Sequence, residues 1–378
     1  MTTPSGSLRD VALLFLKLGT IAFGGPAAHI AMMRDEVVRR RGWMDDQQFL
    51  DKASAVNLVP GPNSTELAIE IGREQQGGCG LLVAGACFIV PAVVIVTTLA
   101  VLYDRYGTTP TAVDLRYGIL PVIVAIVAQA VWGLGKVAVK NVLTGLLAAA
   151  AFAGQLAGVN ELLLLALAAL IGGLWSNRRR LVGGAHSLVL GVVPLPAVGA
   201  ANGDDVGLLR LLLLFLKIGS VLYGSGYVLL AFLEGDFVHR LGWLTEEQLL
   251  DAVAVGQLTP GPVFTTATFI GYQLAGFAGA AVATLGIFLP AFVFVAILGP
   301  VIDWLRTSPW ARGGLDALNA TSLGLMAAVT AQLAGTAFPD ALTVVVGLAA
   351  LAVLLRFKPN SAWLVGAGAA IGLAHGLL

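Results

Sequence analysis

The sequence predicts an all-α integral membrane protein with two homologous halves in inverted topology, about ten transmembrane helices and two re-entrant Pro-Gly-Pro hairpins. Three observations carry this prediction: the composition, an internal repeat and the placement of basic residues. Of the 378 residues, 57% are apolar and only 12% are charged, and the mean hydropathy is +0.87. Such a composition lies far outside that of soluble domains and is typical of a membrane protein.

Continuous apolar runs indicate that the spans are helices. Runs such as 143–156, 162–175 and 341–355 lack the alternating polarity of a transmembrane strand, and a helix satisfies its own backbone groups in lipid. The 22 basic and 22 acidic residues cancel, which gives no support for nucleic-acid binding. Cys79 and Cys87 match no metal-ligand spacing, and we expect neither a metal nor another cofactor.

An internal repeat divides the chain. Residues 13–62 align without gaps on residues 213–262, at an offset of 200, and the match continues to Pro91 and Pro290 after the loss of one residue. The matched segments include Phe15-Leu16-Lys17 with Phe215-Leu216-Lys217, Gly42-Trp43 with Gly242-Trp243, and Pro60-Gly61-Pro62 with Pro260-Gly261-Pro262. A chance match of this length is implausible, so the chain holds two copies of one unit.

Each copy contains five apolar segments. We assign a first half to residues 1–175, a linker to residues 176–207 and a second half to residues 208–378. The predicted helices are 9–32, 80–103, 116–135, 141–157 and 160–175 in the first half, and 208–232, 279–302, 315–335, 341–355 and 361–377 in the second. A mixed region with Pro-Gly-Pro follows the first segment of each half. We expect these regions, 44–76 and 244–275, to form hairpins that enter the membrane and return.

Basic residues in short loops identify the cytoplasmic side of a membrane protein. The basic groups are Arg34 with Arg39 to Arg41, Lys136 with Lys140, Arg178 to Arg180, Arg306 with Arg312, and Arg356 with Lys358. All of them become cytoplasmic if each hairpin returns to its starting side. Five crossings per half is an odd number, so the two halves run in opposite directions. If the hairpins crossed fully, another helix would be needed in the linker, where Leu188–Val198 is short.

Inverted repeats with broken helices are typical of secondary transporters, which bind substrate near the midplane at the repeat interface. Each Pro-Gly-Pro should break its helix, because proline lacks a backbone donor and glycine permits unusual conformations. The helix that restarts offers free amides and a partial positive charge to an anion. The candidate substrate-binding residues at the two breaks are Pro60, Gly61, Pro62, Asn63, Ser64, Thr65, Pro260, Gly261, Pro262, Thr265 and Thr266. The alternative is a kink that serves packing alone.

Two lysines at matching positions are candidate countercharges for an anion. Lys17 and Lys217 lie about nine residues into their segments, or roughly 13 Å deep at a rise of 1.5 Å per residue. A cation at that depth is a functional candidate by default. A structural ion pair, for example with Asp51 and Asp251, is the alternative.

A second glycine-rich break could complete the cavity. Gly24, Gly25 and Pro26 interrupt the first segment, and Tyr223 and Gly224 occupy the same place in the second half. These residues could face the Pro-Gly-Pro hairpin and join the substrate site. Glycine in membrane helices also serves close helix packing, so both readings stay open.

Four titratable residues are candidates for proton coupling. His29 could titrate near neutral pH, and Glu36 occupies the acidic position that both halves share. Glu66 and Glu70 lie one turn apart beyond the first Pro-Gly-Pro, where a buried carboxylate could carry a proton. For Glu70, an ion pair with Arg73 is an equally good reading.

The motifs in combination resemble the chromate ion transporter family. They are FGGPAAHI at 23–30, Glu36, Trp43, LVPGPNST at 58–65, and Gly72, Gly77 and Gly80 leading to Pro91. The resemblance covers essentially the whole chain in the long, two-domain form. It implies an inner-membrane exporter of chromate that confers chromate resistance, with sulfate as the closest mimic and an ion gradient rather than ATP as the driving force. The second half departs from the signature at Tyr223-Gly224-Ser225-Gly226 and at Leu229, so the halves need not bind substrate equally.

The predicted function is therefore secondary transport of a tetrahedral oxyanion such as chromate. The expected partners are that oxyanion and the lipid bilayer, with no nucleic acid, and a homodimer is one option for the assembly. A carrier for sulfate or another oxyanion and an anion channel are the alternatives within transport. An enzyme would need a nucleophile with a base or a metal constellation, and four scattered histidines provide neither.

Overall fold

The computed structural model describes residues 6–23, 25–181, 207–223, 226–357 and 359–377, and all their regular structure is helical. The first half contains α1 (Leu8–Ile21), α2 (Gly25–Arg34), η1 (Asp35–Arg40), α3 (Asp46–Val56), α4 (Asn63–Tyr106), α5 (Pro110–Ala138), α6 (Val142–Leu156) and α7 (Glu161–Leu181). The second half contains α8 (Leu208–Val221), η2 (Gly226–Val228), α9 (Leu229–Leu233), η3 (Glu234–Arg240), α10 (Glu246–Leu258), η4 (Val263–Thr265), α11 (Thr266–Thr307), α12 (Pro309–Ala337), α13 (Ala341–Phe357) and α14 (Ser361–Gly376).

The two halves repeat the same order of helices. α1 to α7 correspond to α8 to α14, with η1 and η3 forming equivalent π-helical turns. α4 and α11 each bend sharply where a glycine, Gly77 or Gly276, adopts a φ of 59°. Only glycine takes up such a conformation without strain, and the bend turns one apolar stretch into a short helix followed by a long one. α7 continues to Leu181, six residues beyond the boundary that the sequence predicted.

The first apolar segment of each half is not one continuous helix, which corrects the prediction for residues 9–32 and 208–232. α1 ends at Ile21 and α2 begins at Gly25, which has a φ of 76°. Gly6 lies against Trp43 and donates its amide proton to Oε1 of Gln75 at 2.9 Å. The chain therefore returns to its starting end twice, and each of these returns is a hairpin of helix, break and helix.

Five helices in the described chain are long and apolar enough to cross a membrane. They are Asn63–Tyr106, Pro110–Ala138, Glu161–Arg178, Val263–Ile297 and Pro309–Ala337, and α6 and α13 are shorter apolar helices. The expected ten spans counted each first segment as one long helix, whereas the breaks at Ala22 and Leu222 leave pieces too short to span a bilayer alone. The protein is thus a multi-pass, all-helical membrane protein, and the number of its spans stays a prediction.

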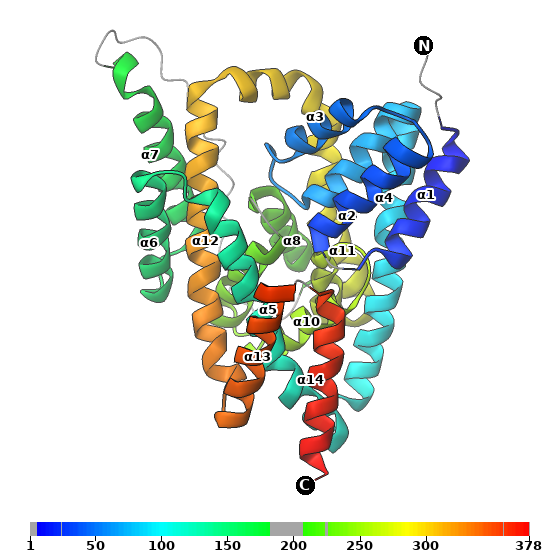
Figure 1. The fold of residues 1–378 in the computed structure, drawn as a ribbon, viewed down its shortest axis with the longest axis vertical. Helices are drawn as coiled ribbons and strands as arrows, with labels where there is room; N and C mark the ends of the chain where they lie inside the picture. Colours follow the sequence, from blue (N-terminus) through cyan, green and yellow to red (C-terminus); the bar gives the residue numbers. More distant parts are fainter. Residues whose placement is uncertain (1–5, 24, 182–206, 224–225, 358, 378) are drawn as a thin grey trace.

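The last helices of the two halves are exchanged (Figure 1). α6 and α7 of the first half pack on α12 of the second, and α13 and α14 of the second pack on α5 of the first. Glycines make these contacts close: a Cβ on Gly118 would lie 1.9 Å from the carbonyl oxygen of Gly368, and one on Gly172 would lie 2.3 Å from that of Gly313. Small residues allow such approach between membrane helices. In Figure 1, α5 rises toward α6 while α12 descends toward α13.

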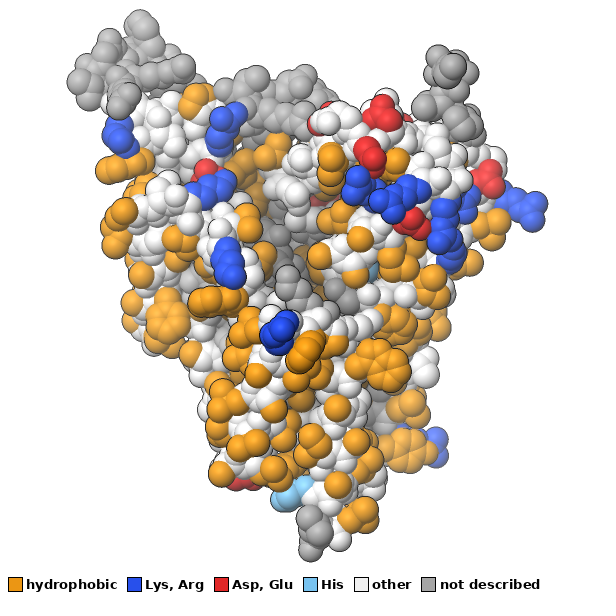
Figure 2. All heavy atoms as spheres, viewed as in Figure 1, with side chains coloured by type: hydrophobic (Ala, Val, Ile, Leu, Met, Phe, Trp, Pro, Cys, Tyr) orange, Lys and Arg blue, Asp and Glu red, His pale blue; other side chains and the backbone are white. Residues whose placement is uncertain are grey.

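Charge is distributed unevenly over the surface (Figure 2). Most Lys and Arg side chains on the visible face gather in its upper part, near α1 to α3 and α7, and hydrophobic side chains cover the middle and lower part. An apolar band of this kind suits a lipid-facing surface, and the cytoplasmic placement of the basic end stays a prediction.

Candidate functional site

Several helix starts from both halves meet at one cavity of about 620 Å³. The first residues of α2 and α4 line it from the first half, and those of η2 and η4, the latter running directly into α11, line it from the second half. These lining residues are Pro26 to Ala28, Pro62 to Ser64, Gly226 and Pro262 to Phe264. The unpaired amides of a helix start carry partial positive charge, so the cavity suits an anion.

The cavity wall is uncharged and mostly apolar in the part of the chain that the structure describes. Its polar side chains are those of Asn63, Ser64 and Gln129, and the remainder of the lining is apolar or glycine. Asn63 donates a hydrogen bond from its Nδ2 to Oδ1 of Asn57 at 2.6 Å. Recognition of a bound anion would therefore depend on amides and neutral side chains rather than on an ion pair.

The breaks are held in place by hydrogen bonds that cross between the halves. The amide of Gly61 donates to the carbonyl of Leu222 at 2.9 Å, and the amide of Gly261 donates to the carbonyl of Ala22 at 3.0 Å. Each Pro-Gly-Pro thus binds the carbonyl of the residue that directly follows the first helix of the opposite half. The phenol of Tyr223 adds a hydrogen bond to the carbonyl of Leu58. The sequence predicted the breaks, and the structure pairs them crosswise.

His29 connects the two breaks of the first half. Its ring is buried, 1% exposed, with Nε2 lying 3.0 Å from the carbonyl oxygen of Ala22 and Nδ1 lying 3.2 Å from Oγ of Ser64. A carbonyl can only accept, so Nε2 carries a proton, and in the neutral ring Nδ1 accepts from the Ser64 hydroxyl. The ring therefore orients a serine that lines the cavity.

Lys17 and Lys217 do not line the cavity. Nζ of Lys17 lies 2.6 Å from Oε1 of Glu36, and Nζ of Lys217 lies 2.6 Å from Oδ2 of Asp236. The alternative of a structural ion pair is therefore confirmed for both lysines, but the partners are Glu36 and Asp236 rather than Asp51 and Asp251. The chain reversal after α1 and after α8 brings the shared acidic position back beside the lysine.

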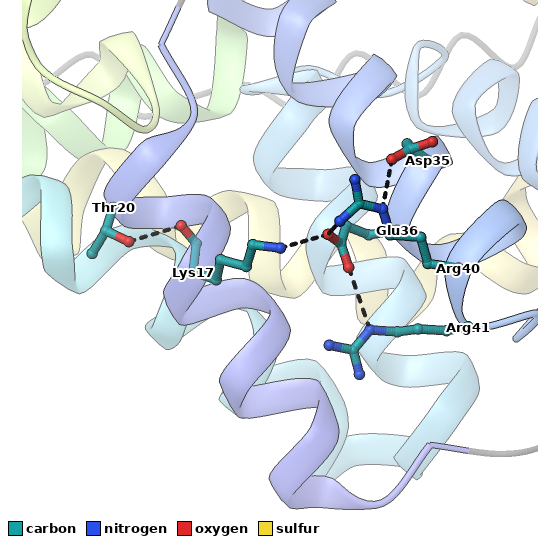
Figure 3. A network of polar contacts seen from close by, with 6 residues as sticks. All are labelled: Lys17, Thr20, Asp35, Glu36, Arg40 and Arg41. Carbon is teal, nitrogen blue, oxygen red and sulfur yellow. Dashed lines mark hydrogen bonds and ion pairs between the residues drawn. The ribbon is translucent and has the colours of Figure 1, made fainter.

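Figure 3 shows the first of these networks. Arg40, the last residue of η1, and Arg41, which follows it, approach Glu36 at 3.1 and 3.7 Å, and Arg40 also forms an ion pair with Asp35. Glu36 is thus surrounded by three cations. In the second half Arg240 approaches Asp236 at 3.0 Å in the same way. The arrangement stabilises the hairpin, and proton coupling by Glu36 stays a prediction.

The two other carboxylate candidates differ in their surroundings. Glu66 is fully buried, neither of its carboxylate oxygens has a hydrogen-bond partner, and it lies against Gly61. Glu70 forms ion pairs with Arg73 at 2.8 Å and with Lys52 at 3.2 Å. The ion-pair reading of Glu70 is therefore confirmed, whereas Glu66 remains a carboxyl placed directly behind the break.

The remaining candidates fall into two groups. Pro26, Pro62, Asn63, Ser64 and Pro262 line the cavity, and Gly25, Pro60, Gly61, Pro260 and Gly261 form the breaks around it. The hydroxyl of Thr265 donates to the carbonyl of Pro262 and that of Thr266 to the carbonyl of Val263, each at 2.8 Å, and Thr65 is buried away from the cavity. Gly24 and Gly224 lie outside the described residues.

Helix α5 contributes lining residues that the sequence analysis missed. Gln129 and Gly133 face the cavity from this helix, and Leu354 faces it from α13. A lone glutamine within an apolar segment was an available signal, because such a polar group needs a polar environment in the membrane.

No group of three or more His, Cys, Asp or Glu residues within the described ranges could hold a metal ion.

Comparison with known proteins gives consistent matches along the whole chain. The family model described as "Chromate transporter" matches residues 9–173 and again residues 209–373. The chain is 31% identical over 374 residues to the "Chromate transport protein" of Cupriavidus metallidurans, covering 98% of this chain and 93% of that protein. It is 29% identical over 361 residues to the "Probable chromate transport protein" of Synechococcus elongatus, covering 92% and 90%.

A third relative agrees with these two. The "Chromate transport protein" of Pseudomonas aeruginosa is 28% identical over 365 residues, covering 94% of this chain and 88% of that protein. No solved structure gives a significant match.

Proposed function

Because the chain belongs to the chromate transporter family, we propose that it is a secondary transporter that exports chromate, or a similar tetrahedral oxyanion, across the inner membrane. The observation that carries this proposal is the uncharged cavity at the meeting point of helix starts from both halves. A helix start binds an anion through free amides and the helix dipole. Export of chromate through this site would give the cell resistance to chromate.

We propose that Asn63, Ser64 and the amides after Pro62 and Pro262 contact the oxyanion directly. These groups line the cavity, and hydrogen bonds to a charged ligand contribute about 1.5–3 kcal/mol each. Gln129 would complete the polar lining from α5. Lys17 and Lys217 would act as countercharges at longer range, with their acidic partners reducing the effect.

The two halves are proposed to alternate access by rocking against each other about this cavity. Because α6 and α7 pack on the second half and α13 and α14 pack on the first, each half is in contact with the last two helices of the other. The hydrogen bonds from the amides of Gly61 and Gly261 also connect the broken helices of the two halves. An inverted topology with hairpins re-entering the bilayer from opposite sides is part of the same proposal. We also propose that the basic end is cytoplasmic.

The energy for export would come from the membrane. The inside-negative potential favours anion exit by about 2.3 kcal/mol per charge per 100 mV. Proton coupling through Glu66, which has no partner for its carboxylate, would add to this force. His29, Glu36 and Glu70 stay as weaker candidates because each already has hydrogen-bond or ion-pair partners. A homodimer is compatible with these proposals.

The experiment that tests the function is radiolabelled chromate flux in proteoliposomes that contain the purified protein. Sulfate, molybdate and phosphate serve as competitors, and pH and voltage gradients are imposed separately. We expect saturable flux of labelled chromate, which unlabelled chromate inhibits better than sulfate does. An inside-negative potential should accelerate the outward flux. Flux of another oxyanion without chromate flux would contradict the substrate, and non-saturable flux would indicate a channel.

A pair of neighbouring hydroxyls tests the site itself. Ser64→Ala removes a lining hydroxyl, and we expect the KM for chromate to rise about tenfold, as the loss of about 1.5 kcal/mol predicts. Thr65→Val removes the adjacent buried hydroxyl and should leave KM unchanged. Equal effects of both variants would place the anion elsewhere.

Lys17→Gln at unchanged expression should weaken oxyanion transport. Full transport activity of this variant would contradict the role of Lys17 as a countercharge.

A further inference from the structure

The two halves carry opposite charges at one pair of equivalent positions. In the first half Nε of Arg34 lies 2.8 Å from Oδ1 of Asp46, an exposed ion pair with side chains 40% and 57% exposed. The offset of 200 places Glu234 and Glu246 at these positions in the second half. An ion pair of the first half is therefore replaced by two carboxylates in the second.

Glu234 is completely buried, and neither of its carboxylate oxygens has a hydrogen-bond partner. The nearest described basic group is Nε2 of His239 at 3.6 Å, on a side chain that is 50% exposed. Lys217 and Arg240 are engaged with Asp236, at 2.6 and 3.0 Å. No lysine or arginine within the described ranges forms an ion pair with Glu234.

Other carboxylates face Glu234 from the elements packed around it. Glu246 of α10 and Glu161 of α7 are both close enough to act on its charge. Thr336 at the end of α12 donates a hydrogen bond to Oε2 of Glu246, which holds that carboxyl group in place. Glu234 thus lies among like charges contributed by both halves of the molecule.

Gly235 explains how the carboxylate of Glu161 enters this space. A Cβ at residue 235 would lie 2.2 Å from Oε1 of Glu161, so a larger residue would displace the carboxyl end. Glu161 itself is 5% exposed, and its Oε1 has no partner. The first half has Asp35 at the position of Gly235. The glycine of the second half therefore leaves the space in which Glu161 lies.

A buried carboxylate without donors and beside like charges is favoured in its protonated form. Burial, with the charges of Glu246 and Glu161, raises the pKa of Glu234 to about 8, and this residue lies in η3, outside the candidate spans. A metal cation is a poorer occupant, because no described group of three or more His, Cys, Asp or Glu residues is arranged to hold one.

We infer that Glu234 is a proton-binding site of the second half, holding one exchangeable proton on its carboxyl between Glu161 and Glu246. Release converts the carboxylic acid to a carboxylate and passes the proton to water. Its repeat equivalent, Arg34, cannot bind in this way because a guanidinium stays charged. The inference concerns the proton alone and makes no assumption about the transported solute.

Infrared titration of the purified full-length protein in detergent tests this inference without any transport assay. The absorption of protonated carboxyl groups is followed from about pH 6 to about pH 10. In the wild-type protein we expect a component that disappears with a midpoint near 8. Glu234→Gln should lack that component, and Arg34→Gln, the matched change in the first half, should keep it.

A second variant keeps the test decisive if Glu234→Gln fails to fold. Glu246→Gln removes a neighbouring negative charge, so the component should persist while its midpoint moves to lower pH. An unchanged carboxyl signal in Glu234→Gln, or an unchanged midpoint in Glu246→Gln, would overturn the inference. A midpoint that depends on Na⁺ at constant ionic strength would overturn it in favour of a cation site.

Discussion

The two halves of this protein share a scaffold but differ in their ionisable groups. Both have a lysine paired with the acidic residue 19 positions later, at 2.6 Å in each half. Both have a Pro-Gly-Pro whose glycine amide bonds to the opposite half. Yet His29 has Leu229 as its equivalent, and the pair Arg34 and Asp46 has become Glu234 and Glu246. Backbone geometry has been kept in both copies, while charge has diverged.

This difference teaches that a shared backbone can carry different side-chain chemistry in its two copies. The first half contributes the polar side chains Asn63, Ser64 and Gln129 to the cavity, and the second half contributes only apolar side chains or glycine to the described lining. The second half instead places the buried carboxyl group of Glu234 between Glu246 of its own α10 and Glu161 of the first half. The duplicated scaffold supplies the cavity, and the polar side chains that line it come from the first copy.

The largest expected difference between the halves concerns the two lysines. The pair formed by Lys217 and Asp236 is buried, with side chains 11% and 2% exposed, whereas Lys17 is 45% exposed. Removing one partner of a buried pair leaves an uncompensated charge. We expect Lys217→Gln to reduce the free energy of unfolding by about 3 kcal/mol and Lys17→Gln by about 1 kcal/mol or less.

Denaturation of the two purified variants in mixed micelles, followed by circular dichroism, measures this difference. Arg240 should retain part of the stability by staying beside Asp236. Equal losses from the two variants would show that the burial of the second pair has no energetic consequence.

The next difference concerns the glycines of the two breaks. Gly61 and Gly261 have φ values of 141° and 90°, which strain any other residue. A Cβ on Gly261 would lie 2.7 Å from Cβ of Ala92, while one on Gly61 would lie 2.4 Å from the carboxylate of Glu66. A carboxylate can rotate away but a packed alanine cannot. We expect Gly261→Ala to cost roughly 2–4 kcal/mol of stability, and Gly61→Ala less.

Thermal unfolding in detergent ranks these two variants. The order should reverse only if displacement of the Glu66 carboxylate is itself costly. A smaller effect at Gly261 than at Gly61 would therefore contradict the packing explanation and point to a fixed position for Glu66.

The smallest expected difference concerns a single hydroxyl. Tyr223 donates to the carbonyl of Leu58, and its repeat equivalent Phe23 has no hydroxyl to do so. Tyr223→Phe makes the halves alike at this position and should cost about 1 kcal/mol, the net worth of one hydrogen bond. The difference in the free energy of unfolding between Tyr223→Phe and the wild-type protein measures this cost, and the KM for chromate is the second readout. An increase in KM without loss of stability would assign Tyr223 to substrate binding instead.

Much of the architecture could be predicted because it depends on local chemistry. Apolar composition predicts helices in lipid, and proline with glycine predicts their breaks at residues 60–62 and 260–262, where the structure has them. The bends within α4 and α11 fall at the predicted ends of the hairpin regions 44–76 and 244–275, but the role of a glycine in each bend was not predicted. Gly77 and Gly276 stand in stretches that carry no proline, and glycine in a membrane helix serves packing as often as bending.

The candidate site was predicted in part. The helix starts at Pro62 and Pro262 do line the cavity, because a break leaves free amides wherever the helix restarts. A structural ion pair was the alternative for Lys17 and Lys217, and only its suggested partners, Asp51 and Asp251, were wrong. The acid that pairs with each lysine lies 19 residues away, which is not a helical spacing and becomes a short distance only when the chain reverses. Gln129 was missed for a related reason, since α5 is far from the breaks in sequence.

The sequence by itself determined that the chain is a helical membrane protein, that it is duplicated, where its helices break, and which family it resembles. These properties follow from residue-level transfer energies and backbone sterics, which act within a few neighbours. Only the tertiary structure decided that Gly61 and Gly261 bond to the opposite half and that α6, α7, α13 and α14 are exchanged. It also brought Glu161 against Gly235. Such contacts depend on how well surfaces that are distant in sequence fit together. A carbonyl left unpaired at a helix end could accept a hydrogen bond from several donors, and the order of residues does not specify which donor is nearest.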